Sequence, residues 1–337
     1  MKSYHMNMGA GLQGLVLREH ARPEPGPGEV LVRVHAVSLN FREIMILIQG
    51  RYPLPVKPDV VAVSDGAGEV VAVGERVTRT RVGDRVIASI FPRWQDGPFG
   101  IAHADQLGGS LDGMLTQYRA LNEDALVPVP SHLSYEEAAT LPCAGVTAWN
   151  ALFGGKTVLP GESVLTLGTG SVSLFALQFA KMAGARVIAT TSSGEKAQRL
   201  RALGADEVVN YRDLPQWAAE VRRLTGGRGV DHVVEVGGAT LAQSLQACAM
   251  GGELALIGSV AGGGAAVEVN TLIASGASVR PIAVGSRAQL ANMARAIGAN
   301  AARPVIDRVF TFDQAPAAFA YYAEGKCFGK VVVKVSD

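Results

Sequence analysis

Cysteine is scarce in this sequence, with three residues among 337: Cys143, Cys248 and Cys327. They stand far apart and form no CxxC pair, so the sequence predicts neither a disulfide framework nor a four-cysteine zinc lobe. Charge is scarce as well: Asp, Glu, Lys and Arg make up 18% of the chain, and 31 Lys plus Arg nearly balance 30 Asp plus Glu. Without a basic stripe or a basic amphipathic face, the chain lacks the usual means of binding nucleic acid or a membrane surface. We therefore expect a small molecule as its partner.

Long apolar runs are also missing. Nowhere do about 18 consecutive apolar residues occur, and the N-terminal residues lack the apolar core of a signal peptide. These absences predict a cytoplasmic protein with no membrane-spanning helix. Glycine, by contrast, is abundant, with 40 residues in a chain that is 48% hydrophobic but only 6% aromatic. This composition is typical of α/β proteins, and the length predicts about two domains.

The first part of the chain, from residue 11 to about residue 128, consists of short Val-rich runs separated by Gly and Pro. Runs of this kind predict a compact, mostly antiparallel β domain. Within it, residues 91–114 show no periodicity, and an irregular segment of 24 residues is uncommon unless it is functional or flexible. We interpret this segment as a candidate lid.

From residue 134 onwards, apolar strands alternate with helical stretches. Successive βα units with continuous apolar strands predict a parallel sheet covered by helices on both faces, which is a doubly wound domain. After a glycine-rich stretch at 261–269 the chain returns to β structure punctuated by Pro, so we expect its tail to rejoin the first domain. The predicted helices cover 134–153, 172–184, 195–204, 214–226, 240–250, 287–298 and 314–325, and the predicted strands cover 163–168, 186–190, 206–211, 230–238, 252–258, 278–284, 304–312 and 329–335.

The clearest chemical signal is a glycine-rich turn between the strand at 163–168 and the helix that follows it. The turn comprises Gly168, Thr169, Gly170, Ser171 and Val172. Glycines at this spacing let backbone N–H groups approach a pyrophosphate, which then lies at the N-terminus of the helix. The alternative is a tight turn between strand and helix that binds no ligand.

The end of the next strand predicts which dinucleotide is bound. An NAD-specific site places Asp or Glu about twenty residues after the turn, where it binds the ribose 2′-OH, and no acid stands there. Hydroxyl groups and positive charge stand there instead, which favours the 2′-phosphate of NADP(H). The residues are Thr191, Ser192, Ser193, Lys196 and Tyr211. For Lys196 the alternative is a solvated charge in the first turns of a helix.

Several motifs together resemble one family. PxPGPGEVLVRVHAVSLN, DGAGEVVAVG followed by VGDRV, LPCAGVTAWNAL, the GTGxVS turn and the closing GKVVV are similar to the medium-chain dehydrogenase/reductase superfamily, and most similar to its zinc-independent, quinone-oxidoreductase-like branch. The resemblance covers essentially the whole chain. It implies an α/β protein with a GroES-like, mostly β substrate domain at 1–127 and 276–337, a doubly wound Rossmann domain with a parallel sheet at 128–275, and a homodimer.

The zinc-containing alcohol dehydrogenases of this superfamily hold their catalytic metal with two Cys and one His. The resemblance places Asn40, Ser64 and Cys143 at those three positions. A catalytic zinc needs three protein ligands and an open position, so we predict no metal. In the alternative, Asp65 and Glu43 join Cys143 as ligands, although no histidine lies in these motifs.

Without a metal, hydrogen bonds alone polarise the acceptor. In the resembling branch the Tyr of a GxYPxP stretch, here residues 50–55, faces the substrate, and the Asn of SLN lies by the nicotinamide. The resemblance therefore predicts Tyr52 and Asn40 as the catalytic pair. A Tyr stacked in a Pro-rich turn and an Asn that caps its own backbone are the alternatives. The resemblance also implies cofactor contacts from Asn40, Thr147, Val236, Gly237, Gly238, Ile257, Gly258, Val284, Gly285 and Ser286.

These features predict an NADPH-dependent oxidoreductase that transfers hydride to an intrinsically electrophilic acceptor, either a quinone or an α,β-unsaturated carbonyl. One alternative is an alcohol or carbonyl dehydrogenase of the same superfamily. Another is a non-catalytic NADPH-binding protein, because a fold does not imply a function.

Overall fold

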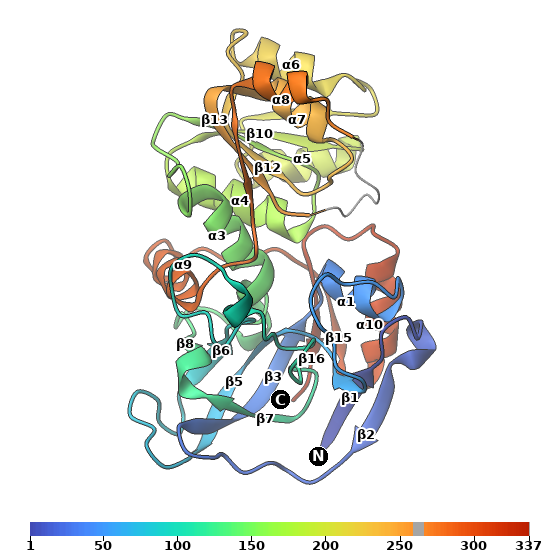
Figure 1. Cartoon of the computed structure of the whole chain (residues 1–337), viewed down its shortest axis with the longest axis vertical. Coiled ribbons are helices and arrows are strands. Elements are labelled where there is room, and N and C mark those ends of the chain that lie inside the picture. Colours follow the sequence, from blue (N-terminus) through green and yellow to red (C-terminus); the bar gives the residue numbers. More distant parts are fainter. Residues whose placement is uncertain (259–265, 337) are drawn as a thin grey trace. The chain divides into compact units, whose positions relative to one another are not determined.

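A computed structural model describes residues 1–258 and 266–336 of the chain. The chain folds as two compact units (Figure 1): unit 1 comprises Met1–Val146 and Ser286–Asp337, and unit 2 comprises Thr147–Gly285. The domain boundaries that the sequence places after residue 127 and before residue 276 stay predictions. In the structure, unit 2 begins at Thr147 and unit 1 resumes at Ser286. In the described residues, no helix is both long and apolar enough to cross a membrane.

Unit 1 is built on two sheets, as the Val-rich runs predict. The larger has the order β15-β16-β3-β5-β6-β8, with β7 also paired to β3, and the smaller has the order β2-β1-β4. All pairings are antiparallel except β15 with β16. The strands are β1 (Lys2–Met6), β2 (Val16–Glu19), β3 (Glu29–Ser38), β4 (Val60–Val61), β5 (Asp65–Val73), β6 (Arg85–Ala88), β7 (Tyr118–Asn122), β8 (Leu126–Pro128), β15 (Ile306–Thr311) and β16 (Lys330–Lys334).

The C-terminal tail rejoins unit 1, as expected, because β16 pairs with β3. A core that includes Met6, Leu39, Ile46 and Phe319 lies between the sheets and the helices. The helices of unit 1 are α1 (Phe41–Leu47), α2 (Tyr135–Ala138), α9 (Arg287–Ala299) and α10 (Ala315–Ala323), with short helices η1 (Leu12–Gly14), η2 (Ile101–His103), η3 (Glu123–Ala125), η4 (Leu141–Gly145) and η5 (Phe312–Gln314). The sequence did not predict α1, which is only two turns long.

The predicted helix at 134–153 is wrong as a single element. It divides into α2, the π-helical turn η4 and α3 (Val146–Phe153). Pro142 lies at the start of η4 and cannot donate a backbone hydrogen bond, so the regular helical ladder is interrupted there. The candidate lid at 91–114 is largely irregular, and its aromatic side chains Phe91, Trp94 and Phe99 pack edge to face against one another.

Unit 2 is a doubly wound domain with one parallel sheet, which confirms the predicted fold. The strand order is β11-β10-β9-β12-β13-β14, so the chain reverses direction across the sheet between β9 and β12, where such domains bind ligands at the carboxyl ends of the strands. The strands are β9 (Ser163–Thr166), β10 (Arg186–Thr191), β11 (Glu207–Asn210), β12 (Val230–Glu235), β13 (Cys248–Leu256) and β14 (Ser278–Pro281). The helices are α3, α4 (Ser171–Met182), α5 (Gly194–Ala202), α6 (Trp217–Leu224), α7 (Leu241–Ala247) and α8 (Val269–Ser275).

Two boundaries in unit 2 differ from the prediction. The helix predicted at 240–250 ends at Ala247, because Cys248 is buried and starts β13. The helix α8 was not predicted, since it is short and follows a glycine-rich stretch. Most of that stretch, residues 259–265, lies outside the described residues.

Candidate active site

A buried lysine lies at the centre of the polar cluster in unit 1. Lys330, the first residue of β16, is 1% exposed, and its Nζ donates to Asn40 Oδ1 at 2.7 Å and to the Leu39 carbonyl at 2.8 Å. The same ammonium lies 3.4 Å from Asp65 Oδ2, and Asp65 is fully buried at the start of β5. The β16–β3 and β3–β5 pairings bring these distant parts of the sequence together.

Glu43 belongs to the same cluster and is also fully buried. Its carboxylate accepts hydrogen bonds from the Asn40 backbone N–H at 2.8 Å and from the Ser64 hydroxyl and N–H, both at 3.2 Å. Asn40 is the N-cap residue of α1. Its backbone therefore begins a helix, while its side-chain oxygen is held by Lys330.

Arg42 connects this cluster to Tyr52. Its Nε donates to the Tyr52 hydroxyl at 3.2 Å, and Nη1 lies 3.0 Å from Glu43 Oε1. Burial opposes the charge of Arg42, but the interactions with Tyr52 and Glu43 outweigh it, so the pKa of this guanidinium is raised above its ordinary value. Nη2 donates to Gln106 Oε1 at 2.9 Å, which ties the irregular segment 91–114 to α1. The two predicted catalytic residues, Asn40 and Tyr52, are thus joined through Arg42 and Glu43.

Cys143 lies in η4, next to the same charges. Burial raises the pKa of its thiol, and the nearby Asp65 carboxylate adds to the shift, so Cys143 is a protonated thiol at neutral pH. Tyr322 of α10 faces the cluster as well. Its pKa is raised well above the ordinary value, first by burial and then by the negative charge of neighbours that include Cys327 and Glu43. Both side chains are therefore neutral here.

A catalytic zinc does not fit these residues. The side-chain oxygen of Asn40 accepts from the Lys330 ammonium, and the Ser64 hydroxyl is held by Glu43. Of these three positions, Cys143 alone offers a thiol, and a catalytic zinc needs three protein ligands. Across residues 1–258 and 266–336, no group of three or more His, Cys, Asp or Glu side chains is placed to hold a metal ion.

In unit 2, the glycine-rich turn leaves space for a ligand. Gly168 has φ +73°, which favours glycine, and a Cβ built on Gly168 or Gly170 would meet no atom within 4 Å. The Ser173 hydroxyl donates to the Leu167 carbonyl at 2.6 Å and closes the turn. In the part of the chain that the structure describes, no side chain caps the N-terminus of α4, so its first N–H groups suit a pyrophosphate. A dinucleotide fits these residues.

The end of β10 lies beside this turn, because Thr190 Oγ1 accepts from the Gly168 N–H at 3.1 Å. Thr191 is 1% exposed, and its hydroxyl has no hydrogen-bond partner among the described residues. The Tyr211 N–H donates to the Thr191 carbonyl at 3.0 Å, so two predicted cofactor residues are neighbours. Ser193 is the N-cap of α5 and accepts from the Lys196 N–H at 3.3 Å, which places Ser192, Ser193 and Lys196 in one turn.

A buried glutamate that the sequence analysis missed shapes the end of β12. Glu235 is fully buried, and its carboxylate accepts from the N–H groups of Gly237 at 2.7 Å and Gly238 at 2.9 Å. It thereby fixes the predicted stretch from Val236 to Gly238. The Ile257 N–H donates to the Glu235 carbonyl at 2.9 Å, so the end of β13, with Ile257 and Gly258, lies beside it.

The remaining predicted cofactor residues lie at the two points where the chain enters unit 2 and leaves it. Val284 has φ +53°, and its carbonyl accepts from Asn150 Nδ2 at 2.9 Å. Gly285 ends unit 2, and Ser286 is the N-cap of α9, where its hydroxyl accepts from the Gln289 N–H at 3.2 Å. Thr147 is 4% exposed, in the first turn of α3.

The sequence carried a signal for two of the residues that were missed. Lys330 and Glu235 are charged residues within or at the end of apolar strands, where Lys and Glu are rarely buried unless they are paired. Arg42 carried no such signal, because its partners Gln106 and Tyr52 are distant in the sequence and it stands in a short helix that was not predicted.

Two known families match the chain. Residues 26–131 match the family described as Alcohol dehydrogenase GroES-like domain, and residues 171–299 match the family described as Zinc-binding dehydrogenase. The chain is 45% identical over 335 residues to a zinc-type alcohol dehydrogenase-like protein of Schizosaccharomyces pombe (strain 972), which covers 97% of this chain and 96% of that protein.

A quinone oxidoreductase of Pseudomonas aeruginosa (strain PAO1) is 35% identical over 268 residues, 79% of this chain and 76% of that protein. Among solved structures, an NAD-dependent alcohol dehydrogenase is 35% identical, with a TM-score of 0.90 and coverage of 100% of both chains.

Proposed function

This chain belongs to the medium-chain dehydrogenase/reductase superfamily and is an oxidoreductase of that family, and from this premise we propose that it is an NADPH-dependent reductase. It transfers hydride to a quinone or an α,β-unsaturated carbonyl without a catalytic zinc. The observation that carries the proposal is the contact of Arg42 Nε with the Tyr52 hydroxyl. Because this hydroxyl accepts from Arg42, its own proton is available for donation to an acceptor oxygen.

Bound nicotinamide supplies the hydride, and Tyr52 supplies the hydrogen bond. As negative charge develops on the acceptor oxygen, the Tyr52 O–H donates to it, and the Arg42 cation next to the phenol favours that charge. Fixed donors of this kind stabilise an oxyanion less than a metal does, so acceptors that are already electrophilic are the suitable substrates. Lys330 holds the side-chain oxygen of Asn40 at 2.7 Å, and in this proposal Asn40 lies beside the nicotinamide.

Two features of unit 2 support NADP(H) as the cofactor. The uncapped N-terminus of α4 and the open turn at Gly168 and Gly170 suit a pyrophosphate. At the end of β10, the hydroxyl groups of Thr191 and Ser192 and the ammonium of Lys196 suit a 2′-phosphate, and no acid stands at the position that would bind a free ribose 2′-OH.

The test is a substrate panel with purified protein. NADPH oxidation is followed with a quinone, an enone and a saturated ketone, and NADP⁺ reduction is followed with secondary alcohols. The proposal expects turnover of the quinone or the enone and little turnover of the alcohols. Efficient alcohol oxidation would select the dehydrogenase alternative instead, and tight NADPH binding with no turnover of any acceptor would select a non-catalytic protein.

We also propose a homodimer in the cytoplasm, formed through unit 2. β14 is an edge strand of the six-stranded sheet, and large apolar side chains on neighbouring elements are exposed: Met250 at 80%, Val269 at 69% and Ile273 at 71%. Exposed apolar surface next to a free strand edge suits a self-complementary interface. Sedimentation analysis should give twice the chain mass, and Ile273→Asp should shift it to the monomer.

A further inference from the structure

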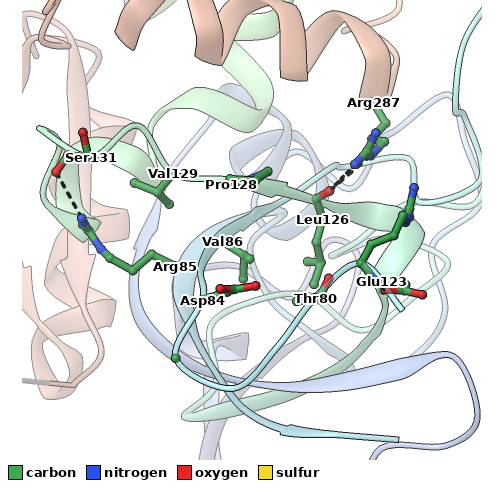
Figure 2. Close-up of a pocket in the computed structure, with 12 residues that line it drawn as sticks. Thr80, Asp84, Arg85, Val86, Glu123, Leu126, Pro128, Val129, Ser131 and Arg287 are labelled. Carbon is green, nitrogen blue, oxygen red and sulfur yellow. Dashed lines mark hydrogen bonds between the residues drawn. The ribbon is translucent and has the colours of Figure 1, made fainter. Parts of the chain in front are cut away.

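A polar pocket lies wholly within unit 1. It shares no residue with the polar cluster around Lys330. It has a volume of about 400 Å³, within the range of small-molecule sites. Figure 2 shows it between the edge strand β8, the strand β6 and the first residue of α9, with Arg85 and Arg287 reaching in from different elements. A third arginine, Arg79, also lines it, and its guanidinium is ion-paired with the Asp124 carboxylate.

Arg287 is held in this pocket without an acidic partner. Its Nε and Nη2 donate to the Leu126 carbonyl at 3.2 and 3.0 Å, and no carboxylate oxygen of the described residues lies within ion-pair distance of it. Burial lowers the pKa of this guanidinium, the neighbouring positive charge of Arg79 lowers it further, and the negative charge of Asp124, which is paired with Arg79, partly opposes both. A guanidinium has five N–H donors, so Arg287 retains donors for a ligand.

The acidic side chains that line the pocket are already occupied. Glu123 accepts from the backbone N–H groups of Thr78 at 3.0 Å and Arg79 at 2.8 Å; although burial opposes its charge, these bonds lower the pKa of the carboxyl below its ordinary value. Asp84 accepts from the N–H and the guanidinium of Arg81. Neither carboxylate pairs with Arg287 or Arg85 in the described part of the chain.

Arg85 provides positive charge at the other end of the pocket. Its Nη2 donates to the Leu133 carbonyl at 2.6 Å, and its guanidinium lies 4.6 Å from the ring centre of Tyr135. These partners are neutral, so its charge is not compensated by them. Between the two ends, the floor is apolar and is formed by Val86, Leu126 and Pro128 (Figure 2).

We propose that this pocket binds a phosphate ester of a small organic molecule, with the phosphate at Arg79 and Arg287 and the organic part on the apolar floor. Arginine forks bind phosphate through paired, charge-assisted hydrogen bonds. Arg79 is paired with Asp124, but the two guanidiniums together still offer more N–H donors than a single carboxylate can use, which suits the three oxygens of a phosphate ester. The apolar floor and the third arginine favour a molecule larger than inorganic phosphate.

The experiment uses phenyl phosphate as the probe, titrated into the full-length protein by calorimetry at constant ionic strength, with inorganic phosphate and benzoate as comparisons. Phenyl phosphate should bind more tightly than either comparison. Arg287→Gln and Arg79→Gln should each weaken its binding by about tenfold or more, as expected for the loss of a charge-assisted contact. Arg76→Gln, which removes an exposed arginine of the same loop that does not line the pocket, should leave the affinity unchanged.

Thermal unfolding of each variant serves as the folding control. Should Arg287→Gln fail to fold because Leu126 loses its donor, Arg79→Gln carries the test, since its side chain is 46% exposed. The proposal is overturned by the absence of phenyl phosphate binding, by equal affinity for benzoate, or by unchanged affinity in folded Arg79→Gln and Arg287→Gln.

Discussion

The Lys330 ammonium lies 2.7 Å from the side-chain oxygen of Asn40. It also lies 3.4 Å from the buried Asp65 carboxylate. A protein cation is thus fixed between Asn40 and Asp65, and it holds the side chain of Asn40 in place.

Lys330→Met should destabilise unit 1 strongly. The substitution leaves the Asp65 carboxylate buried without its cation, and breaking a buried pair from one side costs about 3–5 kcal/mol. Denaturant unfolding measures the loss. The double variant Lys330→Met, Asp65→Asn should recover part of it, because no unpaired charge remains. A double variant as unstable as the sum of the two single variants would contradict the pairing.

Tyr52→Phe should lower kcat/KM for the quinone or the enone by roughly ten- to a thousandfold, with little change in NADPH affinity or Tm, because it removes only the hydroxyl that we propose donates to the developing oxyanion. The matched control is Tyr321→Phe, since the Tyr321 hydroxyl donates to Asp307 at 2.5 Å and lies outside the proposed machinery. Full activity in Tyr52→Phe would remove the role assigned to the phenol and leave proximity as the main source of rate.

More of the fold than of the candidate site could be predicted from the sequence. Strand and helix periodicity locate the doubly wound unit, and the glycine-rich turn falls between β9 and α4 as expected. The network around Lys330 was not predictable from local pattern, because β16 joins β3 across almost the whole length of the chain. Pairings over such distances are set by the tertiary fold, and they decide which charges are buried together.

NADPH should bind more tightly than NADH by about tenfold to a hundredfold, the contribution of one charge-assisted phosphate contact of about 1.5–3 kcal/mol. Lys196→Gln should weaken NADPH binding and leave NADH binding unchanged, so that NADH serves as the control ligand. Fluorescence titration of both cofactors gives the dissociation constants. Equal constants in the wild-type protein would refute the predicted preference.

Asp231 should make the stability of unit 2 depend on pH. Burial opposes its charge, but Arg228, at 2.7 and 2.8 Å, and the Ser163 N–H and hydroxyl, both at 2.8 Å, lower its pKa well below the ordinary value. Since the folded-state pKa is lowered, this contribution is complete above the unfolded-state pKa of about 4 and is lost as the pH falls further.

Asp231→Asn should therefore be less stable than the wild type at pH 7, by about 1–3 kcal/mol. The difference should shrink as the pH is lowered below about 4, because Asp231 of the unfolded wild type then binds a proton while the folded state does not. Denaturant unfolding at a series of pH values measures both. A stability difference that does not change with pH would show that the effect comes from packing and not from ionisation.

Hydride transfer without a metal is tested most directly by the rate of NADPH oxidation in metal-free protein. The protein is dialysed against a strong chelator and shown by elemental analysis to contain almost no zinc. The metal-free protein should reduce the quinone or the enone at the same rate as untreated protein, and added zinc should not increase the rate. A protein that holds about one zinc per chain, loses activity with the metal and regains it when zinc is returned would contradict the account.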